Sequence, residues 1–320
     1  MKIIGVSKKT LVFIKLFIAV GLLWFLFTLV DFRQFWINVK NAKKVFLVAA
    51  MLLYFPANYI LVLRWDSILR YYKIIFPKRQ LFTLYLVSGF LSNFMPTSVG
   101  GDVYKFVCMK KERPQFDKEI LSSIIIERGI GFLSLFLINI ILFFLFAKFT
   151  IYTSSFFAVE ILIILAFLFI VCIIFFKDKV FFFIDNHNNN NRLFAKFKRF
   201  LKVLTSFKKQ QSIFLMFMHS FFFMLMGSLS LFLVFYSLGH CINIFYILLV
   251  FTIVNIFQVL PISLNSIGIY EGLSVYLFGI YGIGLEISLA ATIMGRILLM
   301  LVSSSGGVLY ISKIISKKFK

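Results

Sequence analysis

The stretch Met95-Pro-Thr-Ser-Val-Gly-Gly-Asp102 decides how this chain folds, because it places a proline, two glycines and a carboxylate inside a long apolar run. A second break of this kind, Pro261-Ile-Ser-Leu-Asn-Ser-Ile-Gly268, comes late in the chain and is followed by Tyr270 and Glu271. Unpaired backbone groups are costly in hydrocarbon, so irregular backbone survives there only where protein or a wet cavity covers it. Paired breaks in the two halves of a membrane protein indicate a transport site.

Composition places the chain in a membrane. Of its 320 residues 61% are hydrophobic and 45 are phenylalanine, and the mean hydropathy is +0.99. Several apolar segments exceed the roughly 20 residues that a helix needs to span a bilayer. The apolar segments cover residues 11–30, 45–63, 81–95, 120–147, 156–176, 212–237, 244–262, 269–282 and 286–312. We therefore expect one all-α polytopic transmembrane domain over residues 1–320, in the cytoplasmic membrane.

The net charge of +22 does not indicate nucleic-acid binding, because the 34 Lys and Arg residues lie almost wholly between the apolar segments. In such positions they retain loops on the cytoplasmic side and contact anionic lipid headgroups. The three cysteines and three histidines are scattered without metal-ligand spacing. We expect neither a metal nor another cofactor.

The basic residues also orient the chain. Interval 177–211 holds nine Lys or Arg residues and is predicted to be a cytoplasmic loop, whose part 192–207 has the pattern of an interfacial helix. Interval 238–285 has no Lys or Arg and is predicted to lie outside. Segments 244–262 and 269–282 then begin and end outside, as the two limbs of a re-entrant hairpin.

A second re-entrant hairpin is expected from the cytoplasmic side. Intervals 64–80 and 103–119 each hold five basic residues, and the stretch between them is too short for two full spans. Six full spans with two opposed hairpins form a weak inverted repeat. One interval disagrees with the charge rule, because loop 31–44 holds four basic residues yet falls outside in this topology.

The two halves share a pattern of charges. An acidic residue follows each break, Asp102 in the first half and Glu271 in the second, and the long helix after it carries Arg128 or Arg296. Arg296 lies about ten residues into its segment, near mid-bilayer at about 1.5 Å per residue. Charges inside membrane segments are candidates for function.

Two interpretations of these arginines stay open. They can form interhelical ion pairs that only set packing, with Glu127 and Arg128 neutralising each other. Alternatively they face a phosphate group, which guanidinium matches by its planar fork and permanent charge. Glu271 can pair with Arg296 or take up a proton.

The glycines at the breaks, Gly100, Gly101 and Gly268, allow close backbone approach and positive φ angles. A half-helix starting at Asp102, or after Gly268, would direct its N–H groups and the positive end of its dipole into the site. Asp102 can also be a plain N-cap.

The breaks carry a family resemblance. Leu91-Ser-Asn-Phe-Met-Pro-Thr-Ser-Val-Gly-Gly-Asp-Val-Tyr-Lys105 resembles the P-x-x-x-G-D-x-x-R signature of the flippase-like membrane domain of lysylphosphatidylglycerol synthases and their stand-alone homologues. Ile126-Glu-Arg-Gly-Ile130 is similar to the family's next helix, and Leu260-Pro-Ile-Ser-Leu-Asn-Ser-Ile-Gly-Ile-Tyr-Glu-Gly272 to its P-x-S-x-x-G-x-G-x-x-E element. Arg296 falls where the family's late helix carries arginine.

Two positions depart from the family pattern. Lys105 stands where arginine is usual, which keeps the charge but loses the bidentate fork. Asn265 stands where glycine is common, and asparagine tolerates left-handed backbone. The resemblance implies handling of a lipid or a lipid-linked sugar. It argues against lysyl transfer, because the soluble aminoacyltransferase domain is expected to be absent.

We therefore predict a transporter rather than an enzyme, which translocates an anionic lipid, either a phospholipid or a polyprenyl-phosphate carrier. The alternatives are a proton-coupled transporter of a small anion, with Glu127 or Glu271 as proton carrier, and a transferase or accessory subunit of lipid or envelope-glycan synthesis. A homo-oligomer is compatible with the sequence. The predicted substrate-binding residues are Arg128, Arg296, Lys105, Gly100, Gly101, Asp102, Glu127, Asn265, Gly268 and Glu271.

Overall fold

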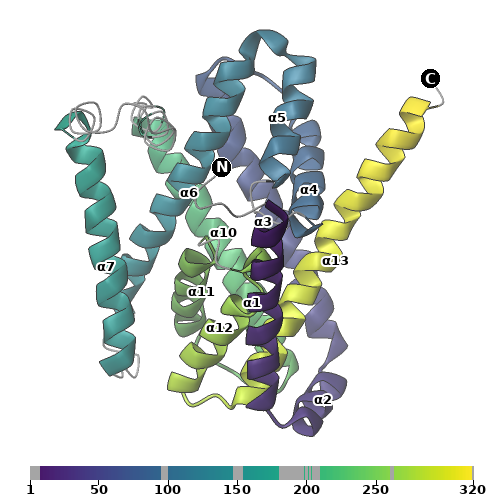
Figure 1. The fold of residues 1–320 in the computed structure, drawn as a ribbon, viewed down its shortest axis with the longest axis vertical. Coiled ribbons are helices and arrows are strands. Elements are labelled where there is room, and N and C mark those ends of the chain that lie inside the picture. Colours follow the sequence, from purple (N-terminus) through teal and green to yellow (C-terminus); the bar gives the residue numbers. More distant parts are fainter. Residues whose placement is uncertain are drawn as a thin grey trace.

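The computed structural model describes residues 8–94, 100–146, 154–179, 210–259 and 263–318, with residues 198, 201 and 203. Regular structure in these residues is helical throughout, which confirms the predicted all-α class (Figure 1). The longer helices are α1 (Lys8–Thr28), α2 (Phe32–Asn41), α3 (Lys44–Tyr71), α4 (Lys78–Phe94), α5 (Gly100–Glu112), α6 (Asp117–Phe146), α7 (Ser154–Phe175), α10 (Gln210–Ser237), α11 (Ile244–Gln258), α12 (Ile269–Ile280) and α13 (Leu285–Lys318).

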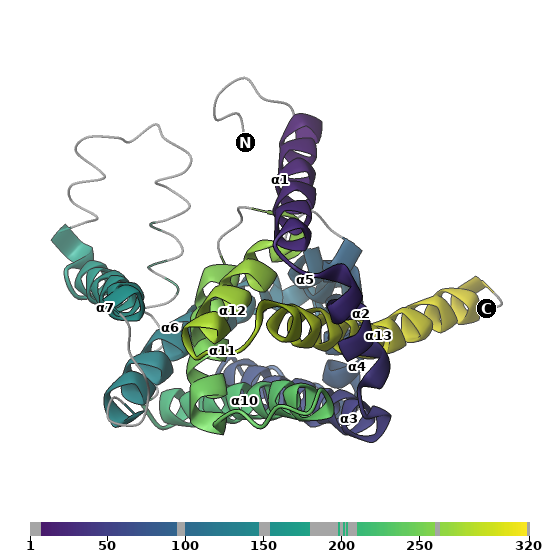
Figure 2. The ribbon, with the colours of Figure 1, turned by 90° about the horizontal axis from the view of Figure 1, so that it is seen from below.

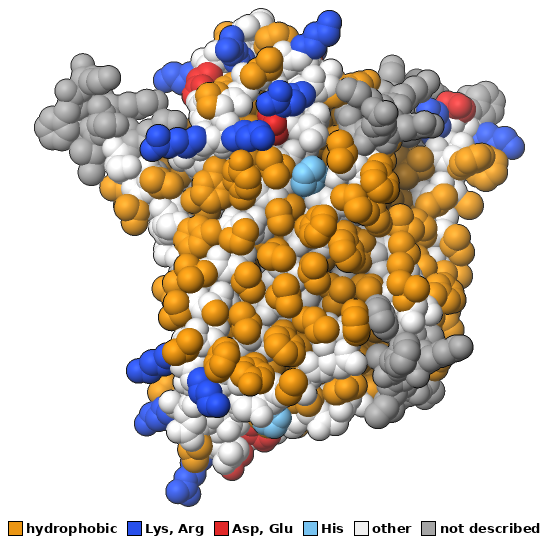
Figure 3. Space-filling view, turned by 180° about the vertical axis from the view of Figure 1, so that it is seen from behind, with side chains coloured by type: hydrophobic (Ala, Val, Ile, Leu, Met, Phe, Trp, Pro, Cys, Tyr) orange, Lys and Arg blue, Asp and Glu red, His pale blue; other side chains and the backbone are white. Residues whose placement is uncertain are grey.

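The polytopic architecture is confirmed as well. Among the described residues, five helices (α3, α6, α7, α10 and α13) are long and apolar enough to cross a membrane, and α1 with α2 makes a sixth candidate bent by 92°. The face in Figure 3 carries a broad belt of hydrophobic side chains, with charged side chains gathered above and below it. This pattern is typical of a protein surrounded by lipid.

Two pairs of short helices form the hairpins. Helices α4 and α5 have 17 and 13 residues, and α11 and α12 have 15 and 12, all below the roughly 20 needed for a span. In Figure 1 the α4–α5 pair lies in the upper part of the bundle and the α11–α12 pair in the lower part, so they enter from opposite ends. Of the turns between them, residues 95–99 and 260–262 lie outside the described residues.

Each hairpin packs into a hydrophobic core of its own. The α4–α5 hairpin contributes Leu81 and Met109 to a cluster with Trp65 of α3 and Ile120 of α6. The α11–α12 hairpin belongs to a larger cluster in which the rings of Phe235 and Phe278 meet. The polar residues at the tips are therefore held on rigid, well-packed supports.

Helix α13 joins the two halves by packing closely on α4. A side chain at Gly306 would collide with the backbone carbonyl of Leu86, and one at Gly307 would collide with the ring of Phe90. Asn93 Nδ2 donates a hydrogen bond to Ser303 Oγ across the same interface, with 2.6 Å between the atoms. The first hairpin thus rests directly on the helix that follows the second.

The interval 31–44, treated above as an outside loop, forms the helix α2. Asp31 caps it by accepting from the N–H groups of Arg33 and Gln34. Trp36 is exposed and lies 5.8 Å from the ammonium of Lys40. An aromatic ring and cations on a helix turned 92° from α1 are typical of the membrane interface, so these charges need no cytoplasmic loop.

The predicted cytoplasmic basic loop, 177–211, lies mostly outside the described residues, and so does the predicted interfacial helix 192–207.

Candidate functional site

The start of α5 lies hard against α4. The N–H of Gly101 donates to Ser92 Oγ at 3.2 Å, and a Cβ at Gly101 would collide with the carbonyl oxygen of Ser88. The expected close backbone approach is therefore present. The suggested positive φ is not, because Gly100 and Gly101 form the first turn of the helix. Asp102 lies inside that turn as well, so the prediction that it caps or starts the helix was wrong.

Asp102 binds Arg128 of α6. The two residues form an ion pair with 2.8 Å between Oδ2 and Nε. The side chain of Asp102 is 9% exposed, whereas that of Arg128 is 55% exposed. This pair places a reachable guanidinium at the tip of the first hairpin.

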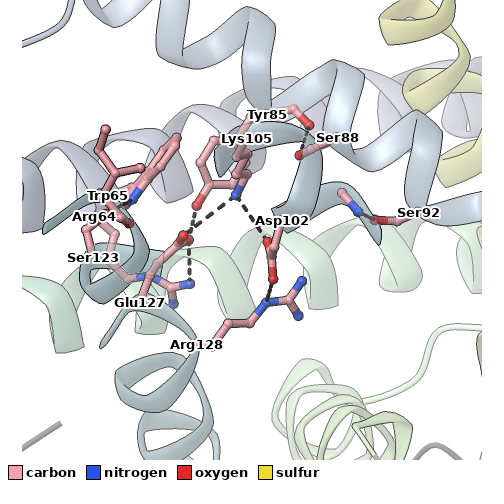
Figure 4. Close-up of polar contacts among 12 residues, drawn as sticks. Arg64, Trp65, Tyr85, Ser88, Ser92, Asp102, Lys105, Ser123, Glu127 and Arg128 are labelled. Carbon is pink, nitrogen blue, oxygen red and sulfur yellow. Dashed lines mark hydrogen bonds and ion pairs between the residues drawn. The ribbon is translucent and has the colours of Figure 1, made fainter. Parts of the chain in front are cut away.

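The packing interpretation had paired Glu127 with its neighbour Arg128, but Glu127 has partners on other helices. Its carboxylate instead accepts a short hydrogen bond from the hydroxyl of Tyr85 and lies 3.4 Å from Nη2 of Arg64. Its other oxygen lies 3.6 Å from the ammonium of Lys105. Figure 4 shows these groups around Glu127, with Arg128 on the far side of Asp102. Successive residues of a helix point in different directions, which explains the separation.

Lys105 bridges the two carboxylates. Its ammonium lies 3.9 Å from Asp102 and 3.6 Å from Glu127, with 5% of the side chain exposed. The same ammonium lies 3.5 Å from the ring centre of Tyr85 and 4.8 Å from that of Trp65. Aromatic faces stabilise a desolvated cation. The structure therefore places Lys105 within the internal network and away from the surface.

Arg64 was missed by the sequence analysis, which counted it among the charges of the interval 64–80. It lies inside α3, is 8% exposed, and donates from Nη1 to Ser220 Oγ at 3.0 Å. Gly131 makes room for it, since a Cβ there would lie 3.1 Å from Nη1. Trp65, Ile68 and Leu69 continue the buried face of α3 beyond it, and that helical spacing was the available signal.

The network carries an excess of positive charge. Arg64, Lys105 and Arg128 contribute three formal positive charges, and Asp102 and Glu127 contribute two negative ones. The difference is one positive charge, and the exposed member of the set is Arg128. An anion that bound at Arg128 would balance the cluster.

The second hairpin holds the corresponding pair. Glu271 Oε1 lies 2.6 Å from Nε of Arg296, and the side chains are 2% and 13% exposed. Nη1 and Nη2 of Arg296 donate to the carbonyl oxygens of Asn265 and Ser266 at 3.2 and 3.4 Å. The ring of Tyr270 lies 4.8 Å from the guanidinium carbon. Of the two predicted roles of Glu271, the structure contains the ion pair.

The backbone of this second tip is left-handed at two predicted positions. Gly268 has φ 85° and precedes α12, and its N–H donates to Glu271 Oε2 at 2.7 Å. Asn265 has φ 48°, so the residue that replaces the common glycine does adopt the left-handed conformation. This turn presents its carbonyl oxygens to Arg296.

The sequence model of one family, the lysylphosphatidylglycerol synthase TM region, matches residues 12–306. The chain belongs to this family. A relative, a UPF0104 membrane protein of Methanothermobacter thermautotrophicus, is 23% identical over 291 residues, which cover 84% of this chain and 86% of the relative. The family membership confirms the resemblance seen in the motifs. Both tips described above fall within the matched part of this family member.

Proposed function

We propose that this family member binds the phosphate of an anionic lipid at Arg128 and moves the headgroup across the cytoplasmic membrane. The observation that carries the proposal is the exposure of Arg128, at 55% of its side chain, in a cluster whose other charges are buried. A cation within a membrane helix is costly, and it is retained where it has a ligand or a pathway to serve.

The excess positive charge of the cluster supports a monoanionic ligand. Asp102 holds Arg128 from the Nε side at 2.8 Å, which orients the planar guanidinium. Guanidinium binds phosphate oxygens through parallel N–H groups, which an ammonium cannot do. A phospholipid and a polyprenyl phosphate share this chemistry, so both are candidate substrates.

Lys105, Glu127, Arg64 and Tyr85 have a supporting part in this proposal. Lys105 contacts the carboxylate of Asp102, which orients Arg128, and Glu127 contacts Lys105. Arg64 and Tyr85 in turn hold Glu127. In this proposal the headgroup contacts the second tip only after it has bound at Arg128. A headgroup reaches Arg296 only if Glu271 and the carbonyl groups at 3.2 and 3.4 Å release it, which requires one half of the molecule to move against the other.

The test measures lipid binding and translocation in proteoliposomes of phosphatidylcholine that carry fluorescent phosphatidylglycerol. Arg128→Ala should lower binding about tenfold or more, since a hydrogen bond to a charged group contributes about 1.5–3 kcal/mol. Arg128→Lys should restore only part of the loss.

Arg70→Ala provides a matched control. Arg70 forms an ion pair with Asp66 at the same 2.8 Å, and its side chain is 53% exposed, but it lies in the last turn of α3 and not at a hairpin tip. Its removal should leave lipid binding unchanged. Equal losses in both variants would reduce the effect to general surface charge and reject a site at Arg128.

Two further substrates, one lipid and one small anion, distinguish the remaining alternatives. Fluorescent polyprenyl phosphate in the same vesicles decides between the two candidate lipid classes. Uptake of inorganic phosphate without lipid movement would replace the proposal by transport of a small anion.

A further inference from the structure

A buried carboxylate lies in α7, away from both hairpin tips. Glu160 is 0% exposed, although much of α7 faces outward, with Leu162 and Leu165 at 57% and 58% exposed. Its neighbours on the buried face, Phe156 and Ile163, are 0% and 2% exposed. It is the one Asp, Glu, Lys, Arg or His in the apolar segment 156–176, and it was not among the residues predicted for a site.

The groups beside Glu160 come from two other helices. Asn139, on α6, is a polar side chain beside the carboxyl group. Asn139 Nδ2 donates to Thr252 Oγ1, on α11, at 3.2 Å, and Thr252 Oγ1 donates in turn to the carbonyl of Leu249 at 2.8 Å. Polar side chains thus run from α7 through α6 to the second hairpin.

Three oxygen atoms in this cluster lack a donor. Among the described residues, neither carboxyl oxygen of Glu160 nor Oδ1 of Asn139 has a hydrogen-bond partner. An ionised carboxylate buried in this position without a partner would cost several kcal/mol. A bound proton removes that charge, and the neutral acid gains an O–H that can donate to an oxygen such as Asn139 Oδ1.

The surroundings supply no cation in place of that proton. In the described residues the carboxylates of Glu127, Asp102 and Glu271 each lie within 4.0 Å of Lys or Arg, and no such pair includes Glu160. On α6 the nearest charges in sequence are Glu127 and Arg128, three turns before Asn139.

The ionisable group that α11 contributes to this core is the phenol of Tyr246. Its hydroxyl donates to the carbonyl of Leu277 at 2.5 Å, so its proton is directed away from the carboxyl of Glu160. Within α7 itself Glu160 is the one acidic or basic residue.

We propose that Glu160 is a proton-binding site that links α7 and α6 to α11 of the second hairpin. With the proton bound, Glu160 donates to Asn139 and completes the polar chain to Thr252. Without it, a negative carboxylate is left buried with no hydrogen-bond donor among the described residues, and α7 must shift or admit water. That this proton drives lipid movement rests on the proposed function, whereas the proton site itself does not.

The first test reads the proton directly. Infrared spectra of the purified protein in nanodiscs at neutral pH should contain the carbonyl stretch of a protonated carboxylic acid. Glu160→Gln, which keeps the side-chain volume, should remove that band, and Glu112→Gln, at an exposed carboxylate, should leave it. Asn139→Leu should shift its frequency, because the acceptor of the O–H is lost. A band that persists in Glu160→Gln, or a wild-type spectrum without one, overturns the site.

The second test reads the coupling. A proton gradient across proteoliposomes should accelerate translocation of fluorescent phosphatidylglycerol severalfold in the wild type, and Glu160→Gln should not respond to the gradient. An equal response in both proteins overturns the coupling. A response to a sodium gradient at constant pH would make the ligand a metal cation and overturn the proton site. Absence of translocation in the wild type rejects the proposed function, while the infrared band still decides the proton site.

Discussion

Asp102 and Arg128 pair at the tip of the first hairpin as Glu271 and Arg296 do at the second, yet the surroundings of the two arginines differ. The side chain of Arg128 is 55% exposed and that of Arg296 is 13% exposed. Carbonyl oxygens of the turn and the ring of Tyr270 enclose Arg296. The carboxylate partner of Arg128, in contrast, is shared with a second cation, Lys105.

The same pairing of an acidic residue with an arginine therefore occurs in two different environments. The second pair is electrically balanced and enclosed, so it cross-links α12 to α13. The first belongs to a cluster with one more positive than negative charge, and its arginine is reachable. The same motif therefore leaves its arginine exposed in one half and encloses it in the other.

The largest expected effect concerns the opposed directions of the hairpins. In a variant with the other cysteines replaced, the native Cys241, exposed between α10 and α11, should react with a membrane-impermeant maleimide from outside the cell only. Arg113→Cys, between α5 and α6 in a cysteine-free background, should react from the cytoplasmic side only. Labelling of both cysteines from one side would contradict the prediction, because the two hairpins would then enter the membrane from the same side.

The next effect is on stability. Arg296→Ala should lower the free energy of unfolding by about 3–5 kcal/mol, because it leaves the carboxylate of Glu271 buried without its cation. Arg128→Ala should cost less than about 1 kcal/mol, as expected for a largely exposed ion pair. Thermal and denaturant unfolding of both variants in the same detergent measures the difference. Equal costs would show that exposure does not separate the two pairs.

A smaller effect is expected from glycine substitutions in the two half-helices. Gly101→Ala should destabilise by about 1–3 kcal/mol, because the new methyl group collides with the backbone of α4. Gly272→Ala is the matched change in α12, where a Cβ lies 3.8 Å from Leu26 and fits. It should be neutral or stabilise by up to about 1 kcal/mol through helix propensity. A tolerated alanine at Gly101 would mean that α5 can move away from α4 at little cost.

The smallest effect on stability is expected from the serine that forms a hydrogen bond to the backbone at each tip. Ser92 Oγ accepts from the N–H of Gly101 at 3.2 Å, and Ser266 Oγ donates to the carbonyl of Gln258 at 2.8 Å. Each serine-to-alanine change should cost about 0.5–1.5 kcal/mol, the usual net value of one hydrogen bond. Unfolding measurements that place the two costs far apart would show that the tips are fastened differently.

Much of the fold could be predicted because membrane constraints are strong. Segment lengths and the distribution of basic residues indicated spans and hairpins, and the break motifs indicated the family. The interval 31–44 was assigned as a loop because its four cations drew attention away from the amphipathic pattern of α2, which contains two of them, Arg33 and Lys40.

The charged residues at the two hairpin tips could be selected from the sequence, whereas most of their pairings could not. Asp102, Arg128, Glu271 and Arg296 were selected, since charge in an apolar segment is visible in a sequence. Glu127 was paired with its neighbour because its actual partners, on α3, α4 and α5, are distant in sequence and are brought together only by packing. Arg64 was read as the end of a loop for the same reason.

Helix α13 contacts both hairpins directly. Arg296 ties it to the second tip, and ten residues later, about 15 Å along the helix, Gly306 bears on the backbone of α4 without an intervening side chain. The backbones of the two helices are therefore in direct contact at this point. A displacement of α12 that carried Arg296 with it would therefore move α13 against α4. Helix α4 is also the helix on which Gly101 packs.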